Sequence, residues 1–182
     1  MAKQTIEESD VLNEGRIKIN ENFTELYGWS GWGVYNDTTY TTGSPFTAST
    51  GSAVLLPNNK GSIIESQKPI DITTFYDGSV ITGQNGDGLN ITIEFRCRPT
   101  TGASNVRMQV KLDIGGAVGV LYPRDFALTK GSGVEHNYLS SFNVYTLNTW
   151  EANGAEVYVE SFNSNIEIYD IRYLITRTHK AR

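Results

Sequence analysis

The sequence predicts a mainly β protein, in which a short N-terminal helix precedes an antiparallel β-sandwich or jelly roll. Two segments alternate clearly between apolar and polar residues, and about ten short strand-like segments follow one another at regular spacing. The composition agrees, because the 182 residues include 18 Gly and 10 Tyr beside many Thr, Asn and Ser, which favour short strands and turns. A helical period appears only near the N-terminus.

The helical signal covers residues 10–27. Thr5 to Glu8 has the form of a capping box, and Asp10 is a second candidate for the N-cap. We expect the helix to end near Tyr27, with Gly28 in the left-handed conformation. A helix of this length is marginal in water without a packing partner. It should therefore dock on its own β domain, on other copies of the chain, or on a larger particle.

Apolar residues along this helix follow the 3-4 spacing of a short coiled-coil seam. Leu12, Ile19 and Leu26 lie seven residues apart and would occupy d positions, while Arg16 and Phe23 would occupy a positions. A seam of two heptads does not specify the number of helices. The predicted attachment or oligomer interface consists of Leu12, Arg16, Ile19, Phe23, Leu26 and Tyr27.

The segment from Gly28 to Gly33, with sequence GWSGWG, is expected to be a flexible aromatic joint. It divides the chain into a helical attachment or oligomerisation segment with its joint, residues 1–32, and a β-sandwich jelly-roll domain, residues 33–182.

The clearest strands are predicted at residues 89–97 and 106–114, each with one buried and one solvated face. The connection 99–105 is expected to be a hairpin loop. Cys97, the only cysteine, shares a face with Phe95 and is expected in the core. The last long strand, 165–177, changes phase near Ile168, which indicates either a bulge or a strand with both faces covered. Weaker strands are predicted at 34–40, 52–56, 62–65, 79–82, 118–122, 138–145 and 156–162.

The sequence offers little support for catalysis or metal binding. The two histidines, His136 and His179, lie far apart in sequence, and residues 85–88 lack the alternating carboxylates of a calcium loop. No Gly-x-Ser-x-Gly elbow follows a strand. We therefore expect no catalytic residues, no metal and no cofactor. The carboxylates that qualify for glycoside hydrolysis by residue type alone are Glu94, Asp113, Asp125, Glu135 and Glu160.

Charge and hydropathy exclude two further classes of partner. The formal net charge of -5 argues against nucleic-acid binding, and no apolar run is long enough to insert into a membrane. No signal peptide is visible at the N-terminus.

The basic residues among positions 172–182 predict either a solvated tail or a contact with an acidic neighbouring chain. Aromatic residues that could stack on a glycan are Trp29, Trp32, Tyr35, Tyr40, Tyr122, Tyr138, Tyr145 and Trp150.

Residues 13–27 resemble the segment GR-x-K-x-N-x-N-F-x-E-L-Y that recurs near the start of small tailed-phage virion proteins. Further short strings are similar to the rest of such proteins: 75–78 with 86–88, 112–116, 149–154 and 169–182. The resemblance covers most of the chain and carries over no catalytic residues.

This resemblance implies a homotrimer on the virion surface, whose helical segment anchors to phage capsid or tail proteins and whose TNF-like jelly roll points outward. The implied role is a non-enzymatic decoration protein, head fibre or tail-fibre knob. The alternative is the receptor-binding tip module of a tail fibre, which would bind a host surface glycan or protein. The chain has no extended shaft after Tyr27, which favours a compact knob.

Overall fold

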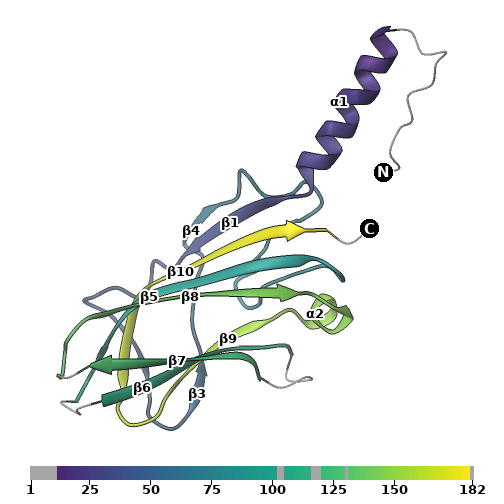
Figure 1. Ribbon diagram of the computed structural model, residues 1–182. Coiled ribbons are helices and arrows are strands. Elements are labelled where there is room, and N and C mark those ends of the chain that lie inside the picture. The colour runs from purple at the N-terminus through teal and green to yellow at the C-terminus, as the bar shows by residue number, and fades with distance from the viewer. Residues whose placement is uncertain (1–11, 102–104, 116–119, 130, 181–182) are drawn as a thin grey trace.

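The computed structural model describes residues 12–101, 105–115, 120–129 and 131–180. A helix projects from one end of a two-sheet β-sandwich (Figure 1), which confirms the predicted mainly β fold. The helices are α1 (Leu12–Gly28) and α2 (Asn148–Asn153). The strands are β1 (Gly31–Asn36), β2 (Phe46–Ala48), β3 (Ala53–Leu55), β4 (Ser62–Ile64), β5 (Gly88–Pro99), β6 (Asn105–Asp113), β7 (Val120–Thr129), β8 (His136–Tyr145), β9 (Glu156–Ser161) and β10 (Ile166–His179).

The two sheets are antiparallel and of unequal size. The larger has six strands in the order β4-β1-β10-β5-β8, with β2 also paired to β10, and the smaller has the order β3-β9-β6-β7. The 14-residue β10 is the centre of the larger sheet, because it pairs with β5 along one edge and with β1 and β2 along the other.

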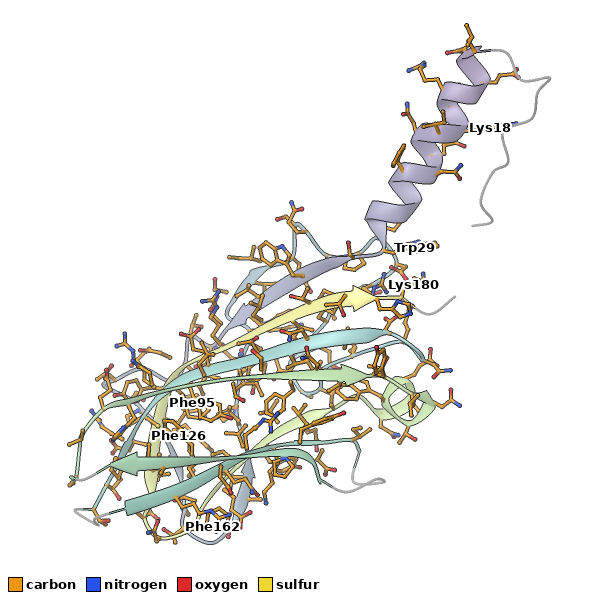
Figure 2. The ribbon with its side chains drawn as sticks, viewed as in Figure 1. Lys18, Trp29, Phe95, Phe126, Phe162 and Lys180 are labelled. Atoms are coloured by element: carbon orange, nitrogen blue, oxygen red, sulfur yellow. The ribbon has the colours of Figure 1, made fainter. Side chains whose placement is uncertain are left out.

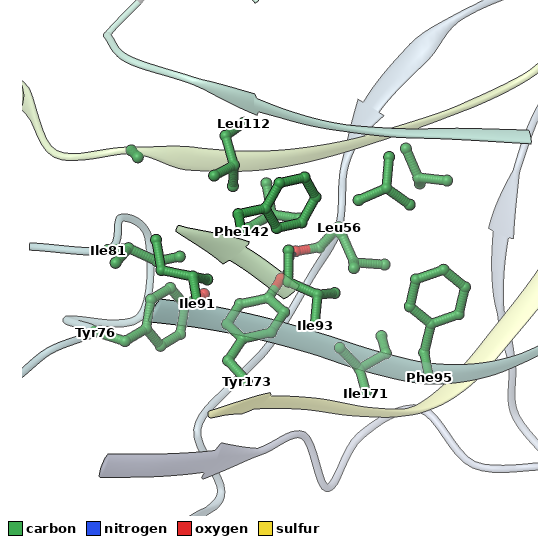
Figure 3. Packing of buried hydrophobic residues seen from close by; sticks show 14 of the residues in the cluster. Leu56, Tyr76, Ile81, Ile91, Ile93, Phe95, Leu112, Phe142, Ile171 and Tyr173 are labelled. Atoms are coloured by element: carbon green, nitrogen blue, oxygen red, sulfur yellow. Dashed lines mark hydrogen bonds between the residues drawn. The ribbon is translucent and has the colours of Figure 1, made fainter. Parts of the chain in front are cut away.

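The core lies between the two sheets, where the inward-facing residues of alternating strands meet. In β5, Ile91, Ile93 and Phe95 are almost fully buried, while the residues between them face outward. Phe142 and Leu112 approach them from β8 and β6 (Figure 3). Period-two alternation thus produces one apolar face on each sheet, and burial of these faces stabilises the sandwich.

A β-bulge interrupts the central strand pair, which is one of the two alternatives that the change of phase in the sequence predicts. The register between β10 and β5 shifts between Tyr169 and Arg172, two residues beyond the expected position near Ile168. Asp170 adopts a φ of 53°, and its backbone N–H donates to the carbonyl of Tyr40 at 3.1 Å. The extra residue lets both halves of β10 keep their apolar residues inward.

Cys97 lies in the core, as predicted, and its side chain is fully buried. Burial, with a smaller contribution from the charge of Glu135, raises the pKa of Cys97 to about 12. Because the thiolate is the reactive form, this thiol is chemically inert near neutral pH.

Several strand predictions are wrong in detail. The connection 99–105 is not a hairpin, because β5 and β6 belong to different sheets. Segment 79–82 forms no strand, and Ile81 makes isolated bridges to Tyr76 and Ala155. The short strand β2 and helix α2, which buries Trp150, were not expected. Strand β7 also extends through Pro123 to Thr129, well beyond the predicted end at residue 122. Alternation identifies a strand but not its partner, and of the three strands of three residues it found β3 and β4 but missed β2.

Truncation of a core leucine should test this packing. Leu112→Ala removes a side chain that is fully buried, so we expect a loss of about 2–5 kcal/mol in the free energy of unfolding. Leu55→Ala is the matched control on the same sheet, because Leu55 is 40% exposed, and should cost less than about 1 kcal/mol. Urea unfolding followed by circular dichroism measures both values. Equal losses for the two variants would contradict the assigned core.

Candidate functional site

Helix α1 leaves the sandwich at Gly28 and projects away from both sheets (Figure 1). Its described apolar side chains are open to solvent: Leu12 is 96% exposed, Ile17 and Ile19 are each 42% exposed, and Phe23 is 53% exposed. The β domain of the same chain therefore does not cover this surface of the helix. Of the three docking surfaces expected for α1, other copies and a larger particle are the two compatible with this geometry.

All six predicted interface residues belong to α1, and the structure describes the side chains of four of them. Leu12, Arg16, Ile19 and Phe23 lie on the exposed helix, and Arg16 donates to the side chain of Asn13 at 3.0 Å. The side chains of Leu26 and Tyr27 lie outside the described residues, as does the predicted capping segment from Thr5 to Asp10. The seven-residue spacing overlooked Ile17, which is as exposed as Ile19.

Gly28 is the last residue of α1 rather than a left-handed residue after it, so that part of the prediction is wrong. The chain continues from Gly28 into β1 with only Trp29 and Ser30 between the two elements. The carbonyl of Gly28 accepts a hydrogen bond from the backbone N–H of Ile70 at 3.1 Å. This bond satisfies one of the free carbonyls at the helix C-terminus, for which a left-handed cap was expected.

Backbone hydrogen bonds and a close backbone approach connect the joint between α1 and the sandwich to the segment after β4. The N–H of Trp32 donates to the carbonyl of Gln67 at 3.0 Å. A Cβ atom on Gly31 would lie 2.1 Å from the same carbonyl, so only glycine fits there. This glycine permits close backbone approach, whereas the sequence alone suggested that it provides mobility.

Arg177, near the end of β10, organises the base of the helix. Its side chain is fully buried, and its Nε donates to the carbonyl of Trp29 at 2.6 Å. Its two terminal nitrogens bond to both carboxylate oxygens of Asp71, and Nη1 also lies 3.2 Å from Oδ2 of Asp87. A second cation, Lys180, donates to Asp71 at 2.5 Å. We call these five residues, Trp29, Asp71, Asp87, Arg177 and Lys180, the joint cluster.

Trp29 and Lys180 complete the joint cluster at its solvent side. The ammonium of Lys180 lies 5.4 Å from the centre of the Trp29 ring, within the range of a cation–π interaction (Figure 2). Burial by itself raises the pKa of Asp71, but hydrogen bonds from Arg177 and Lys180 and the charge of Arg177 outweigh burial. The pKa therefore falls from 3.8 to about 2.

The basic residues near the C-terminus are thus partners of acidic residues in their own chain. Arg177 and Lys180 belong to the joint cluster, and Arg172 lies 3.5 Å from Glu94. Arg177 is buried and so does not belong to a solvated tail, whereas Arg172 is about half exposed, and a contact with an acidic neighbouring chain stays a prediction. Sequence reasoning missed the cluster, because Asp71 and Asp87 lie far from Arg177 along the chain.

The carboxylates considered for hydrolysis do not meet in one cleft. Glu94 and Glu135 lie on the larger sheet near Arg172 and Arg96, at 3.5 and 3.7 Å. Asp125 and Glu160 lie on the smaller sheet and pair with Arg107 and Lys111. Asp113 also belongs to the smaller sheet. The carboxylates of the smaller sheet are thus on a different sheet from Glu94 and Glu135, and four of the five lie in ion pairs, which does not favour an acid–base couple across a substrate.

A cavity of about 440 Å³ lies on the larger sheet around the bulge, and charged side chains line much of it. Arg96 lies 3.8 Å from Asp170, and the pair of Arg172 and Glu94 lies beside it. Opposite charges alternate across the lining, so the cavity has no strong preference for an anion or a cation.

In the described part of the chain, no cluster of three or more His, Cys, Asp or Glu could hold a metal ion. The described helices include none with the length and apolarity needed to cross a bilayer.

The aromatic residues considered for glycan stacking are dispersed. Tyr35, Tyr138 and Trp150 are core residues, with at most 2% exposure. Tyr145 is 74% exposed on β8 and Tyr122 is 39% exposed on β7, and these strands belong to different sheets. Core burial, rather than ligand stacking, explains most of the conspicuous aromatic content.

Among known proteins, no family model and no curated sequence matches this chain. Similar solved structures exist. The Eiger TNF protein from S. frugiperda has 7% identity and a TM-score of 0.54, over 84% of this chain and 95% of that chain. The PRD1 vertex protein P5 has 11% identity and a TM-score of 0.43, over 83% and 98%. A chain of the IBDV viral particle has 10% identity and a TM-score of 0.46, over 81% and 31%.

These comparisons concern the fold. The similarity to the Eiger protein shows that the β-sandwich of this chain is TNF-like. The two viral proteins are structural neighbours at lower TM-scores.

The depressed pKa of Asp71 predicts a specific dependence of stability on pH. The folded protein favours ionised Asp71, so its ion pairs stabilise the fold above about pH 4, and this contribution is lost as the pH falls toward 2. Wild type should therefore be more stable than Asp71→Asn at pH 7, and the difference should shrink below pH 4. Urea unfolding of both proteins across this range measures the difference. A constant difference down to pH 2 would contradict the joint cluster.

Proposed function

We propose that this chain is a non-enzymatic structural protein of a tailed-bacteriophage virion. It forms a homotrimer that decorates the particle surface, with α1 as the attachment element and the β-sandwich as an outward knob. The observation that carries the proposal is the projection of α1, whose apolar side chains its own β domain leaves exposed.

The exposed residues of α1 favour association with other helices. Leu12 and Ile19 are two of the expected d positions, whereas Ile17 adds exposed apolar surface on another face of the helix, because residues two apart do not share a face. Complete burial of one such side chain contributes about 1.5–3 kcal/mol, and this gain is repeated in every copy of a symmetric bundle. Polar residues such as Glu14 and Asn20 would remain in water. The same helices can then contact capsid or tail proteins of the particle.

Strand β8 supports self-association of the knob. Among the described strands it pairs with β5 alone, and it contains no Asp, Glu, Lys or Arg that would protect its edge by charge. Leu139 and Tyr145 on this strand are 65% and 74% exposed. The outer faces of both sheets differ from this edge, because ion pairs such as Arg107–Asp125 and Arg172–Glu94 lie on them. An uncharged edge favours burial against a second copy, whereas the charged faces favour solvent.

The TNF-like fold and the resemblance of residues 13–27 to tailed-phage virion proteins support the same proposal from different directions. The dispersion of the carboxylates and the lack of a shared cleft for them support a non-enzymatic role. The virion surface is the location that this combination favours.

A charge placed in the helix seam should abolish both association and attachment. In Ile19→Asp, three buried carboxylates would meet in the bundle, so we expect smaller species in sedimentation velocity and loss of co-sedimentation with virions that lack the protein. Glu21→Gln is the matched control on the same helix and should behave as wild type. Normal particle binding by Ile19→Asp, or by residues 29–182 alone, would refute attachment through α1.

A charge on the open edge of β8 should weaken the knob contact. Leu139→Glu is expected to lower the proportion of the largest species in sedimentation equilibrium, because a carboxylate would be buried between copies. Leu55→Glu makes the same change at an exposed site on the smaller sheet and should leave the distribution unchanged. If both variants assemble like wild type, β8 does not contribute to association.

A further inference from the structure

We propose that Arg177 is an orientation lock, which fixes the direction in which α1 leaves the β-sandwich and makes the helix and the sandwich one rigid body. The lock is the buried guanidinium of Arg177 together with the three groups that it holds: the carbonyl of Trp29 and the carboxylates of Asp71 and Asp87. The meaning of this lock for attachment rests on the proposed function, but its existence does not.

The guanidinium links the joint after α1 to two distant points of the connection between β4 and β5. Trp29 belongs to the joint, and Asp71 and Asp87 both belong to the connection, Asp87 in the turn directly before β5. A single planar group with several donors in fixed directions reaches all three. A rotation of α1 about the joint would displace the Trp29 carbonyl and break a 2.6 Å hydrogen bond to a buried charge.

The cost of breaking this arrangement explains why it can act as a lock. The side chain of Arg177 is fully buried, with 0% exposure to solvent, and that of Asp87 is 1% exposed. Water therefore cannot replace a lost partner without opening the base of the sandwich. A buried charge that loses one hydrogen-bonding partner is strongly destabilised. The helix direction seen in Figure 1 is thus coupled to the integrity of the domain.

Backbone contacts on the other side of the joint restrict the same motion. The carbonyl of Gly28 accepts from Ile70, and the N–H of Trp32 donates to Gln67. Both partners belong to the connection that carries Asp71. The joint is therefore clamped between this connection and Arg177 of β10. Without the guanidinium, the backbone bonds alone would leave the Trp29 carbonyl and the two carboxylates without their common partner.

Pulsed electron paramagnetic resonance on the full-length chain tests the lock directly. Nitroxide labels at Glu21→Cys in α1 and Glu151→Cys in α2 report the distance between helix and sandwich, and both sites are exposed. Cys97 is buried and should remain unlabelled. Labelled chains are refolded with an excess of unlabelled chains, so that distances within one copy dominate. Wild type should give a single narrow distance peak.

Two variants remove the lock in different ways. Arg177→Lys keeps the charge but replaces the planar fork of donors by a compact ammonium that does not match the directions of the three acceptors. The triple variant Arg177→Met, Asp71→Asn, Asp87→Asn leaves no buried charge uncompensated. Both should keep the far-ultraviolet circular dichroism of the sandwich and lose the narrow peak. Arg172→Lys is the matched control, because Arg172 lies on the same strand in a half-exposed ion pair, and should retain the peak.

A broad distribution in wild type, or a narrow peak at the wild-type distance in both folded lock variants, would overturn the proposal. Loss of the peak in Arg172→Lys as well would also overturn it, because the effect would not be specific to Arg177. A wild-type chain with the narrow peak that fails to bind virions would refute the proposed function alone. A chain that binds virions with a broad peak would refute the lock alone.

Discussion

A guanidinium is tolerated inside a protein only where carboxylates and carbonyls surround it, and Arg177 imposes this requirement at the base of α1. The joint after the helix contributes one partner, and the connection between β4 and β5 contributes two. The need of the buried guanidinium for these acceptors determines how the joint and the connection are placed at this end of the sandwich. Gly31 must lack a side chain, and Gln67 must lie beside it, for the joint to reach the guanidinium.

The same chain thus combines a tightly held joint with an exposed helix. A helix on a mobile tether would lose much orientational freedom on binding, whereas a helix of fixed direction has already lost it during folding. The apolar residues of α1 are therefore presented in an arrangement that reduces the entropic cost of association. This combination connects the folding energetics of the β domain with the proposed attachment, because the domain supplies the order that the helix needs.

The sequence predicts the long strands well and the connections poorly. Alternation in β5, β6 and β10 marks the buried faces, including Cys97 and the bulge near Asp170, because each strand carries its own pattern. The assignment of β5 and β6 to different sheets depends on partners, which a local pattern does not contain. The spacing of apolar residues along α1 predicts a seam, which stays a prediction. The joint cluster could not be predicted, since its acidic and basic members come together only in the folded chain, and the glycines of the joint suggested mobility instead of close approach.

The central position of β10 also has a consequence for the order of folding. The larger sheet needs this strand between β1 and β5, although β10 is made after every other strand of the sandwich. During synthesis, the edges of β1 and β5 that pair with β10 therefore remain unpaired, and their apolar faces remain uncovered, until β10 has been made. Pairing across such long sequence separations is slow, and exposed edges of this kind invite aggregation. Cellular production of this protein should accordingly depend on chaperones that shield the nascent chain until β10 has been released from the ribosome.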